Sequence, residues 1–378
     1  MIETTPTMQG VDSAEWDRLA GAADPFLSHE FMSIMEQSGS AIAAEGWQGT
    51  HVLAQDASGG LIGAVPLWLK GHSQGEYIFD HGWAEAWHRA GGAYYPKAIA
   101  AVPFTPVSGR RLLHDSAATG PDPRPALIAG MEAVADRYQL SSLHALFITE
   151  DEVPLYRAAG WLIRTGLQFH WQDQGYGDYG GFLAALSSRK RKALRKERRQ
   201  AAQSGLIFRQ LTGDAIRARH WDAMWEFYQD TGARKWGQPY LTRAAIDMLA
   251  EQMADRILLI MAETPDGEPV AGALNFIGED TLYGRYWGCV EQHHSLHFEL
   301  CYHQAIEYAL AHGLTRVEAG AQGEHKLNRG YLPVPTYSAH HIPHPGFRDA
   351  ITSFLNAETE AVEREIEILR DMGPFRAA

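Results

Sequence analysis

Apolar residues along the chain recur at spacings that predict alternating helices and strands in two successive blocks. In the second block they appear first at the helical spacing and then every second residue, which indicates helices followed by a meander of buried strands. The expected elements are helices across 214–254, strands at 257–263, 270–277 and 281–288, a helix at 295–312 and a strand at 316–319. This order predicts a mixed α/β domain in the second half of the chain.

The first block has the same outline but is less regular. Between its strands, residues 77–113 are rich in aromatic residues and glycine, and Pro96, Pro103 and Pro106 exclude a long helix through 95–107. We expect that segment to pack on the domain or to bind a ligand. The other expected elements are short helices over 12–45, strands at 51–54 and 61–69, a helix at 126–138, a strand at 144–149 and a short helix before Gly160.

Two amphipathic segments complete the pattern. Glycines between 175 and 181 predict a flexible join to a helix that runs from Phe182 to Gln203 and stops at Gly205. Residues 347–370 predict a C-terminal helix with one apolar side, which we expect to pack back on the N-terminal half. We therefore predict two domains, 1–178 and 179–378, the second of which begins with the helix 182–203.

The composition is that of a globular enzyme. With 378 residues and 45 % hydrophobic content, the chain can bury two cores of ordinary size. Its two cysteines, Cys289 and Cys301, do not support a disulfide framework. Residues 1–16 have neither the basic nor the apolar part of a secretory signal, and no apolar run reaches the roughly 18 residues of a membrane span. We expect a cytoplasmic protein.

One short segment departs from the acidic character of the chain. The formal net charge is −13, yet residues 189–199 carry eight Arg or Lys against the single acid Glu197. Such a run cannot neutralise itself through i,i+4 pairs, so it predicts binding of a polyanion or a phosphate-bearing donor. A solvated helix without a ligand and a nuclear-localisation signal are the alternatives. The residues expected to contact phosphates are Arg191, Lys192, Arg195 and Arg198.

A polar, glycine-rich turn after the last expected strand is the candidate reaction centre, because ligand sites in open α/β sheets lie at the carboxyl ends of strands. Transfer of an acyl group to an amine needs a proton acceptor, for which Glu324, His325 and Glu299 are candidates. It also needs a donor to the oxyanion, for which Lys326 and Arg329 are candidates. For Glu299, a helix-dipole partner in a first turn is the alternative. The turn brings together Glu318, Gln322, Glu324, His325, Lys326 and Arg329.

Other reactive residues give weaker predictions. His293 and His297 have a spacing that metal ligands use, but no acid completes a metalloprotease motif, so we expect no metal. Cys289 lies in a hydrophobic strand, where a buried Cys is ordinary. A serine hydrolase is not supported, since no G-x-S-x-G motif occurs.

Six segments carry a family signature: YIFDHGWAEAWHRAGGAYYPK, VPFTPVSGRRLL, LSSRKRKALRKERR, RYWG, HFELCYHQAIEYALAHGL and EAGAQGEHKLNRGYLP. Over nearly the whole chain, the sequence resembles the FemAB-like N-acyltransferases of bacteria, a family of the GNAT superfamily related to peptidoglycan biosynthesis. The resemblance implies an α/β fold of tandem GNAT-like acyltransferase domains with mixed sheets, joined by the basic helix, and the formation of an amide bond. It also implies a positioned lysine, which we match to Lys326.

The resemblance is consistent with aminoacyl-tRNA as donor, because relatives that extend peptidoglycan stem peptides draw amino acids from it. Ordinary GNAT enzymes instead hold CoA with a glycine-containing loop before a helix, whereas residues 289–298 here contain no glycine. Acyl-CoA acting on a small amine is therefore the alternative to aminoacyl-tRNA or another phosphate-bearing carrier, and no tightly bound cofactor is expected.

The acceptor amine is expected to belong to a peptide, a cell-wall precursor or a small molecule. The loop 77–113 is expected to lie on the acceptor side. A non-catalytic protein that binds RNA or a cell-wall precursor is a further alternative. The residues expected to bind substrate are Phe104, Thr105, Arg110, Trp287, Tyr302, Glu318, Gln322 and Arg329.

Overall fold

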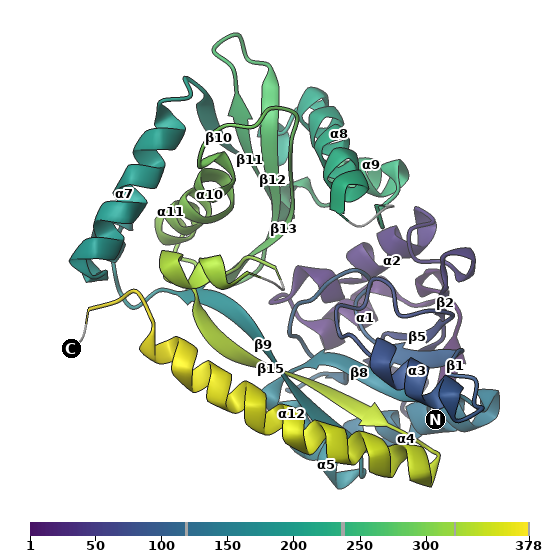
Figure 1. Cartoon of the computed structure of the whole chain (residues 1–378). Coiled ribbons are helices and arrows are strands. Elements are labelled where there is room, and N and C mark those ends of the chain that lie inside the picture. Colours follow the sequence, from purple (N-terminus) through teal and green to yellow (C-terminus); the bar gives the residue numbers. More distant parts are fainter. Residues whose placement is uncertain (118–119, 236–238, 321–322, 377–378) are drawn as a thin grey trace. The chain divides into compact units, whose positions relative to one another are not determined.

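The chain divides into two units according to the contacts of its backbone. Unit 1 contains residues 1–167 and 335–365, and unit 2 contains residues 168–334 and 366–378. The computed structural model describes residues 1–117, 120–235, 239–320 and 323–376 (Figure 1). Both units are therefore discontinuous in sequence, whereas we predicted two continuous domains that meet at residues 178 and 179.

Unit 1 contains two groups of hydrogen-bonded strands. The first has the order β1-β3-β4-β7 and is antiparallel throughout. The second has the order β15-β8-β6-β5-β2, in which only β6 and β8 are parallel. The strands are β1 (Ile2–Thr5), β2 (Trp47–Gly49), β3 (His51–Gln55), β4 (Leu61–Val65), β5 (Leu67–Lys70), β6 (Lys97–Ala100), β7 (Leu113–His114), β8 (Leu143–Ile148) and β15 (Leu332–His341, of which residues 335–341 belong to this unit).

The helices of unit 1 cover these strands through apolar side chains. Leu127 and Met131 of α4 are buried in one core with Val52, Leu67 and Leu143 from the strands. The segment 77–113, which is rich in aromatic residues and glycine, contains helix α3 and strand β6. The main helices are α1 (Ser13–Ala20), α2 (His29–Gln37), α3 (His81–Arg89), α4 (Arg124–Tyr138) and α5 (Val153–Ala158).

The C-terminal helix α12 (Pro345–Asp371) belongs to unit 1 as far as Glu365. Its residues Phe347, Ile351 and Leu355 form a buried cluster with Trp83 and Tyr94 of unit 1. The rings of Phe347 and Trp87 stack with centroids 4.6 Å apart. The amphipathic pattern of residues 347–370 therefore reflects real burial along this part of the helix.

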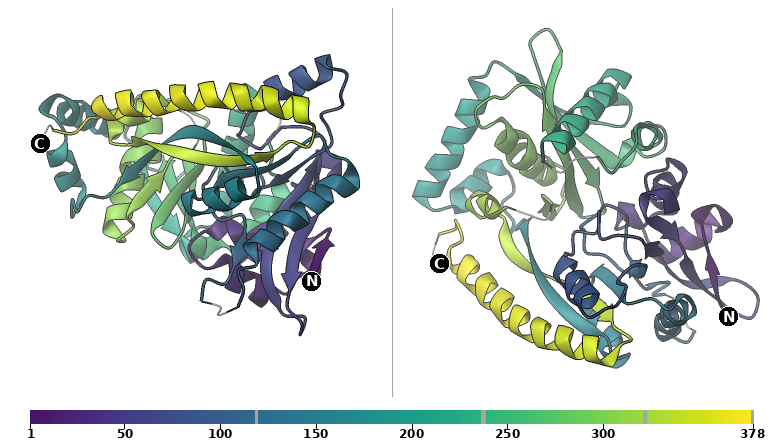
Figure 2. Two further views of the ribbon diagram at one scale, coloured as in Figure 1. Left: turned by 90° about the horizontal axis from the view of Figure 1, so that it is seen from below. Right: turned by 45° about the vertical axis from the view of Figure 1, so that its right-hand side comes forward.

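Unit 2 is built on a meander of antiparallel strands. Helix α8 covers one face of the meander and helix α11 lies on the other, as Figure 1 and the right-hand view of Figure 2 show. The strand order is β10-β11-β12-β13-β14-β9, and only β13 and β14 are parallel. The strands are β9 (Leu162–Gln172, of which residues 168–172 belong to this unit), β10 (Ile207–Thr212), β11 (Ile257–Glu263), β12 (Pro269–Ile277), β13 (Thr281–Cys289) and β14 (Arg316–Glu318).

Small residues allow α8 to lie close to the meander. A methyl group on Gly288 would meet the backbone of Phe227 at 2.1 Å, so glycine is required there. The other helices of unit 2 are α6 (Tyr179–Ala185), α7 (Ser188–Ala202), α8 (Ala218–Lys235), α9 (Arg243–Gln252), α10 (Leu296–Phe298), a π-helical turn (Glu299–His303), α11 (Gln304–Ala311) and the 3₁₀ helix η8 (Glu324–Arg329).

The prediction of a single helix from Phe182 to Gln203 is wrong, because the chain forms two helices there, α6 and α7. Leu186 and Ser187 are extended between α6 and α7, with ψ near 153° and 148°. The Ser187 amide donates to the Pro374 carbonyl at 2.9 Å, and Leu186 forms a β-bridge with Phe375. Residues from the end of the chain thus satisfy backbone groups that a continuous helix would have used internally.

Within the described part of the chain, every helix is too short or too polar to cross a bilayer.

Candidate active site

The two parallel strands of unit 2 separate at the point where the predicted polar turn begins. β13 and β14 are paired only from Thr281 to Tyr283, opposite residues 316–318. β13 then continues to Cys289, with a register shift against β12 near Asn275 that increases its local bend. β14 ends at Glu318, and after Gly320 and Gly323, both with positive φ, the chain enters η8. Beyond Tyr283, β13 therefore continues without β14 as its neighbour, and the chain that leaves the carboxyl end of β14 is at a usual place for a ligand.

Lys326 of η8 lies buried beside this separation. Its side chain is almost fully enclosed, with 1 % of the residue exposed, and Nζ donates a hydrogen bond to the Gly320 carbonyl at 2.6 Å. Burial lowers the pKa of Lys326 to about 7, although nearby Cys301 and Glu318 act in the opposite direction. An amine with such a pKa can exchange a proton near neutral pH, which makes Lys326 a candidate for catalysis.

Glu318 of β14 and His170 of β9 form a second buried pair, next to each other across adjacent strands. The His170 Nδ1 lies 3.6 Å from the Glu318 carboxylate, and its Nε2 lies 3.1 Å from Gln168 Oε1. Burial lowers the pKa of His170 to about 3, helped by the positive charges of Arg316 and Lys326. The imidazole is therefore neutral near pH 7. His170 was not among the predicted site residues, because the strand β9 that places it beside Glu318 was not predicted.

His325 and Tyr302 extend the site toward solvent. The His325 ring is exposed, and its Nε2 lies 2.9 Å from the Tyr302 hydroxyl. The ring of His297 is 5.6 Å from that of Tyr302 and 5.1 Å from that of Trp287. Aromatic rings thus connect His325, next to Lys326 in sequence, with the end of β13.

A pocket of about 330 Å³ opens at that end of β13. Its walls combine an aromatic face with polar groups, and the Glu291 carboxylate pairs with His293 at 2.9 Å. Six of its lining residues come from the stretch 289–298, which contains no glycine. The lining residues are Thr231, Trp287, Cys289, Glu291, Gln292, His293, Leu296 and His297.

Two predicted site residues, Glu299 and Arg329, form ion pairs with side chains of helix α7. The buried Glu299 carboxylate pairs with Arg198 at 3.0 Å and accepts from Gln304 at 2.8 Å. Arg329 is also buried and pairs with Glu197. Two further predictions are not placed: Gln322 lies outside the described residues, and so does the side chain of Glu324.

The expected phosphate-binding residues of α7 differ in their surroundings. Lys192 and Arg195 are exposed, whereas Arg191 is half-buried and donates to the Ala184 carbonyl at 3.3 Å. Arg198 turns toward its own unit, where it pairs with Glu299 and, at 2.8 Å, with Glu307. The exposed cations of this helix are Arg189, Lys192, Arg195, Lys196 and Arg199.

The expected acceptor residues of unit 1 are held inside that unit. Phe104 and Thr105 are buried, and Phe104 has a positive φ of 58°. Arg110 donates to the carbonyl groups of Leu19 and Ala20 at 3.0 and 2.6 Å. The loop therefore has a packing role in unit 1.

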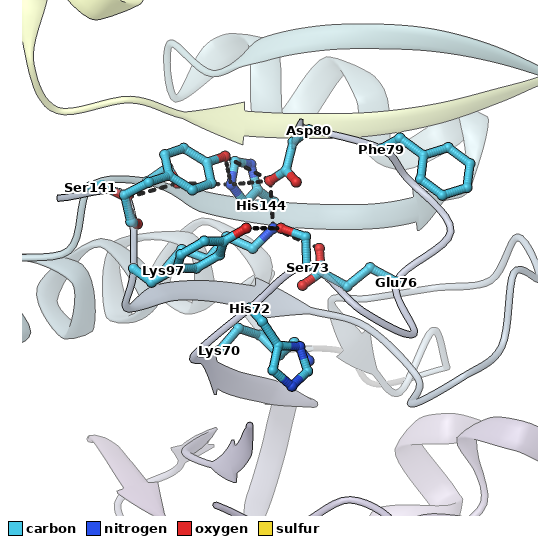
Figure 3. A network of polar contacts seen from close by, with 12 residues as sticks. Lys70, His72, Ser73, Glu76, Phe79, Asp80, Lys97, Ser141 and His144 are labelled. Carbon is cyan, nitrogen blue, oxygen red and sulfur yellow. Dashed lines mark hydrogen bonds and ion pairs between the residues drawn. The ribbon is translucent and has the colours of Figure 1, made fainter. Parts of the chain in front are cut away.

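Unit 1 contains a buried polar cluster that was not predicted from the sequence (Figure 3). The Lys97 ammonium is fully buried and donates to Glu76 at 2.7 Å, Asp80 at 2.5 Å and Ser73 at 2.8 Å. The Tyr94 hydroxyl donates to the same Asp80 carboxylate at 2.7 Å. Residues 73–80 are thereby fastened to strand β6.

The charges of this cluster are shifted by burial and by each other. Burial alone would lower the pKa of Lys97, but Glu76 and Asp80 raise it above its ordinary value. Burial raises the pKa of Glu76 to about 7 and lowers that of the neighbouring Lys70 to about 7. Among the described residues, Glu76 Oε1 and Asp80 Oδ1 are buried oxygens without a hydrogen-bond partner. Asp80 lies in the segment FDHGW and Lys97 in the segment YYPK. Neither segment predicts this arrangement, because Lys97 is 17 residues from Asp80 and 21 from Glu76 in the chain.

Comparison with known proteins agrees with this architecture. The family model FemAB-like, described as peptidoglycan biosynthesis/recognition, matches residues 7–377. No curated protein sequence matches the chain.

Several solved structures have a similar fold. FemX has a TM-score of 0.57 and 12 % identity, with 90 % of this chain and 98 % of FemX covered. L-PGS from Bacillus licheniformis has a TM-score of 0.53 and 11 % identity, with 89 % and 98 % covered. The C-terminal domain of a candidate lysylphosphatidylglycerol synthetase from Agrobacterium fabrum has a TM-score of 0.55 and 10 % identity, with 91 % and 95 % covered. At these identities the likeness concerns the fold alone.

Proposed function

The chain belongs to the FemAB-like family, and on that premise we propose that it is an N-acyltransferase that joins an activated acyl or aminoacyl group to an amine. The observation that carries the proposal is Lys326, an enclosed amine with a depressed pKa at the place where β13 and β14 separate. Lys97 pairs with two carboxylates, whereas Lys326, like Lys70, donates to a neutral carbonyl, and of these two only Lys326 lies where β13 and β14 separate.

In the proposed reaction, the lone pair of the acceptor amine attacks the carbonyl carbon of the donor. A C–N bond forms, the bond from that carbon to the carrier breaks, and one proton passes from the amine to the leaving group. The protonated form of Lys326 would donate to the oxyanion that develops on the carbonyl oxygen, inside a site with little water to compete. His325, exposed beside it, is our candidate to accept the proton of the amine.

We propose aminoacyl-tRNA as the donor, in line with the sequence resemblance to transferases that draw on it. The exposed cations of α7 are suited to an RNA backbone, because they form a positive surface on an otherwise acidic chain. The pocket at the end of β13, with Trp287 and His297 in its walls, has ring faces on which a terminal base or a planar acyl group can stack.

Transfer can be tested directly with two donors. The protein would be incubated with bacterial tRNA charged with radiolabelled amino acids, or with labelled acetyl-CoA, in the presence of lysine-containing peptides and cell-wall precursors. We expect label in an alkali-stable amide from the tRNA donor. Label from acetyl-CoA without RNA would identify a small-amine acetyltransferase instead, and no product from either donor would contradict the enzyme assignment.

Substitution of Lys326 tests the site itself. We expect Lys326→Met to lower kcat by about 10²–10³, the usual effect of losing one oxyanion donor, with a smaller change in KM. Arg243→Met, which removes an exposed cation of α9, is the matched control and should retain activity. Full activity of the Lys326 variant would show that the reaction centre lies elsewhere, and retained biological activity without transfer would favour a binding protein.

A further inference from the structure

The single acid of the basic run joins helix α7 to the helix that carries Lys326. Glu197 of α7 makes a two-point pair with Arg329 of η8: Arg329 Nη2 lies 2.8 Å from Oε1, and Nε lies 3.2 Å from Oε2. Such parallel contacts fix both the distance and the orientation of the two side chains. Glu197 therefore fixes the position of Arg329 relative to α7, in addition to lying in a charged segment.

Arg329 passes this restraint to the backbone around Lys326. Its Nη1 donates to the His325 carbonyl at 2.7 Å, and its guanidinium lies 3.4 Å from the centre of the Phe298 ring. Lys326 and Arg329 are three residues apart in a 3₁₀ helix, so they share one side of it. A short 3₁₀ helix has weak internal hydrogen bonds, and η8 consequently depends on such outside contacts for its conformation.

Glu197 is itself held in place from the other side. The His303 Nε2 lies 3.2 Å from Glu197 Oε2, and the Tyr179 hydroxyl lies 2.7 Å from His303 Nδ1. Burial would raise the pKa of Glu197, but the His303 hydrogen bond and the charge of Arg329 lower it below its ordinary value. The carboxylate is thus ionised at neutral pH and can keep Arg329 paired.

The same helix presents exposed cations within one turn of Glu197. Arg195, Lys196 and Arg199 surround it in sequence and are open to solvent. An anion that binds these cations would act on the same rigid element that holds Arg329. The neighbouring pair of Arg198 with Glu299 fastens α7 to the π-helical turn instead, and so provides an internal comparison.

We propose that Glu197 is a positioning residue for Lys326, and that through Arg329 it couples a polyanion bound on α7 to the conformation of η8. The inference depends on the proposed function only in taking Lys326 as the reacting group and α7 as the donor surface. The restraint on η8 and on the environment of Lys326 can be measured without any assay of transfer.

Glu197→Gln, which keeps the size of the side chain and removes its charge, is the test variant. We expect amide hydrogen exchange in 325–331 to become about tenfold faster, because the local opening of η8 becomes easier. We also expect the pH midpoint for acylation of Lys326 by acetic anhydride, followed by peptide mass spectrometry, to rise by about one unit as water reaches the amine. Glu307→Gln, which weakens only the Arg198 side of α7, should change neither quantity.

Coupling is tested by adding unfractionated bacterial tRNA. In the unsubstituted protein, tRNA should slow exchange in 325–331, and in Glu197→Gln it should bind but no longer slow that exchange. Unchanged exchange and unchanged Lys326 labelling in a folded Glu197→Gln protein would overturn the positioning role, and equal protection by tRNA in both proteins would overturn the coupling. Failure of the unsubstituted protein to bind tRNA would count against the proposed donor and the coupling, while the positioning role would still be decided by the first two measurements.

Discussion

Lys97 and Lys326 are both buried lysines, but their partners give them opposite properties. Lys97 lies between two carboxylates, which raise its pKa and keep it an ammonium ion. Lys326 has a neutral carbonyl as its hydrogen-bond acceptor, and burial lowers its pKa to about 7. Removing a buried cation from its paired carboxylates destabilises the fold, whereas a buried cation without a hydrogen-bonded carboxylate is itself destabilising and is available for chemistry.

The pH dependence of stability should reveal this difference. The ordinary pKa of lysine is 10.5, so between about pH 7 and 10.5 the unfolded chain binds a proton at Lys326 that the folded chain does not. The contribution of Lys326 to the free energy of unfolding is therefore lowest below pH 7 and increases as the pH rises toward 10.5. Lys326→Met should be more stable than the unsubstituted protein by about 1–4 kcal/mol at pH 7, and the difference should shrink toward pH 10.

Urea unfolding at several pH values measures both quantities. Lys97→Met is the opposite control, because it leaves Glu76 and Asp80 buried without their cation and should lose about 3–5 kcal/mol. A Lys326→Met protein that is less stable at pH 7 would mean that Lys326 is a structural cation like Lys97.

At the scale of elements, helix α7 combines an anchored side with an exposed cationic side. Glu197 and Arg198 connect it to unit 2, and Leu194 is buried against that unit. Lys192 and Arg195 remain exposed, and they are the members of the predicted phosphate-binding set that an external anion can reach without breaking a pair. The sequence pattern could identify the charge of this helix but not which of its charges are already satisfied.

Charge reversal should therefore be limited to the exposed members. We expect Lys192→Glu with Arg195→Glu to weaken binding of bacterial tRNA and to reduce the slope of log affinity against log salt by about 1–2. Arg364→Glu on α12 is the control, since Arg364 is an exposed helical cation outside α7. Filter binding over a salt series gives the slopes, and identical slopes for the double variant and the control would remove α7 from the donor surface.

At the scale of the whole molecule, each unit is assembled from two separate parts of the sequence. In unit 1, β15 pairs with β8 from Tyr337 to His341, and α12 covers Trp83 and Tyr94. The continuous domain 1–178 that we predicted lacks both of these elements. Its buried strand β8 would lose one neighbour, and two large aromatic side chains would lose their cover.

Expression of fragments tests this arrangement. We expect residues 1–178 alone to aggregate or to unfold without a cooperative transition. The same fragment with residues 335–365 attached through a long Gly/Ser linker should regain a cooperative transition, since it restores β15 and most of α12. Circular dichroism during thermal unfolding distinguishes the two, and cooperative unfolding of 1–178 alone would contradict the expectation.

The sequence by itself determined the elements whose pattern is local. The meander of β11, β12 and β13, the helix α4 and the extent of α12 follow from apolar periodicity and turn residues, and their predicted bounds differ from the observed ones by a few residues at most. Lys326 was also singled out from sequence, because glycines and polar residues directly follow a recognisable strand, and its catalytic role stays a prediction.

Only the tertiary structure decided what depends on residues far apart in the chain. β15 contains Pro333 and Pro335 and β9 is half-polar, so neither has the pattern of an ordinary strand, and their partners supply what the local signal lacks. His170 reaches Glu318 only through β9, and Lys97 reaches Glu76 and Asp80 only through a folded loop. Ionisation and pairing of buried groups depend on these long-range neighbours, and the residue types of a segment do not specify them.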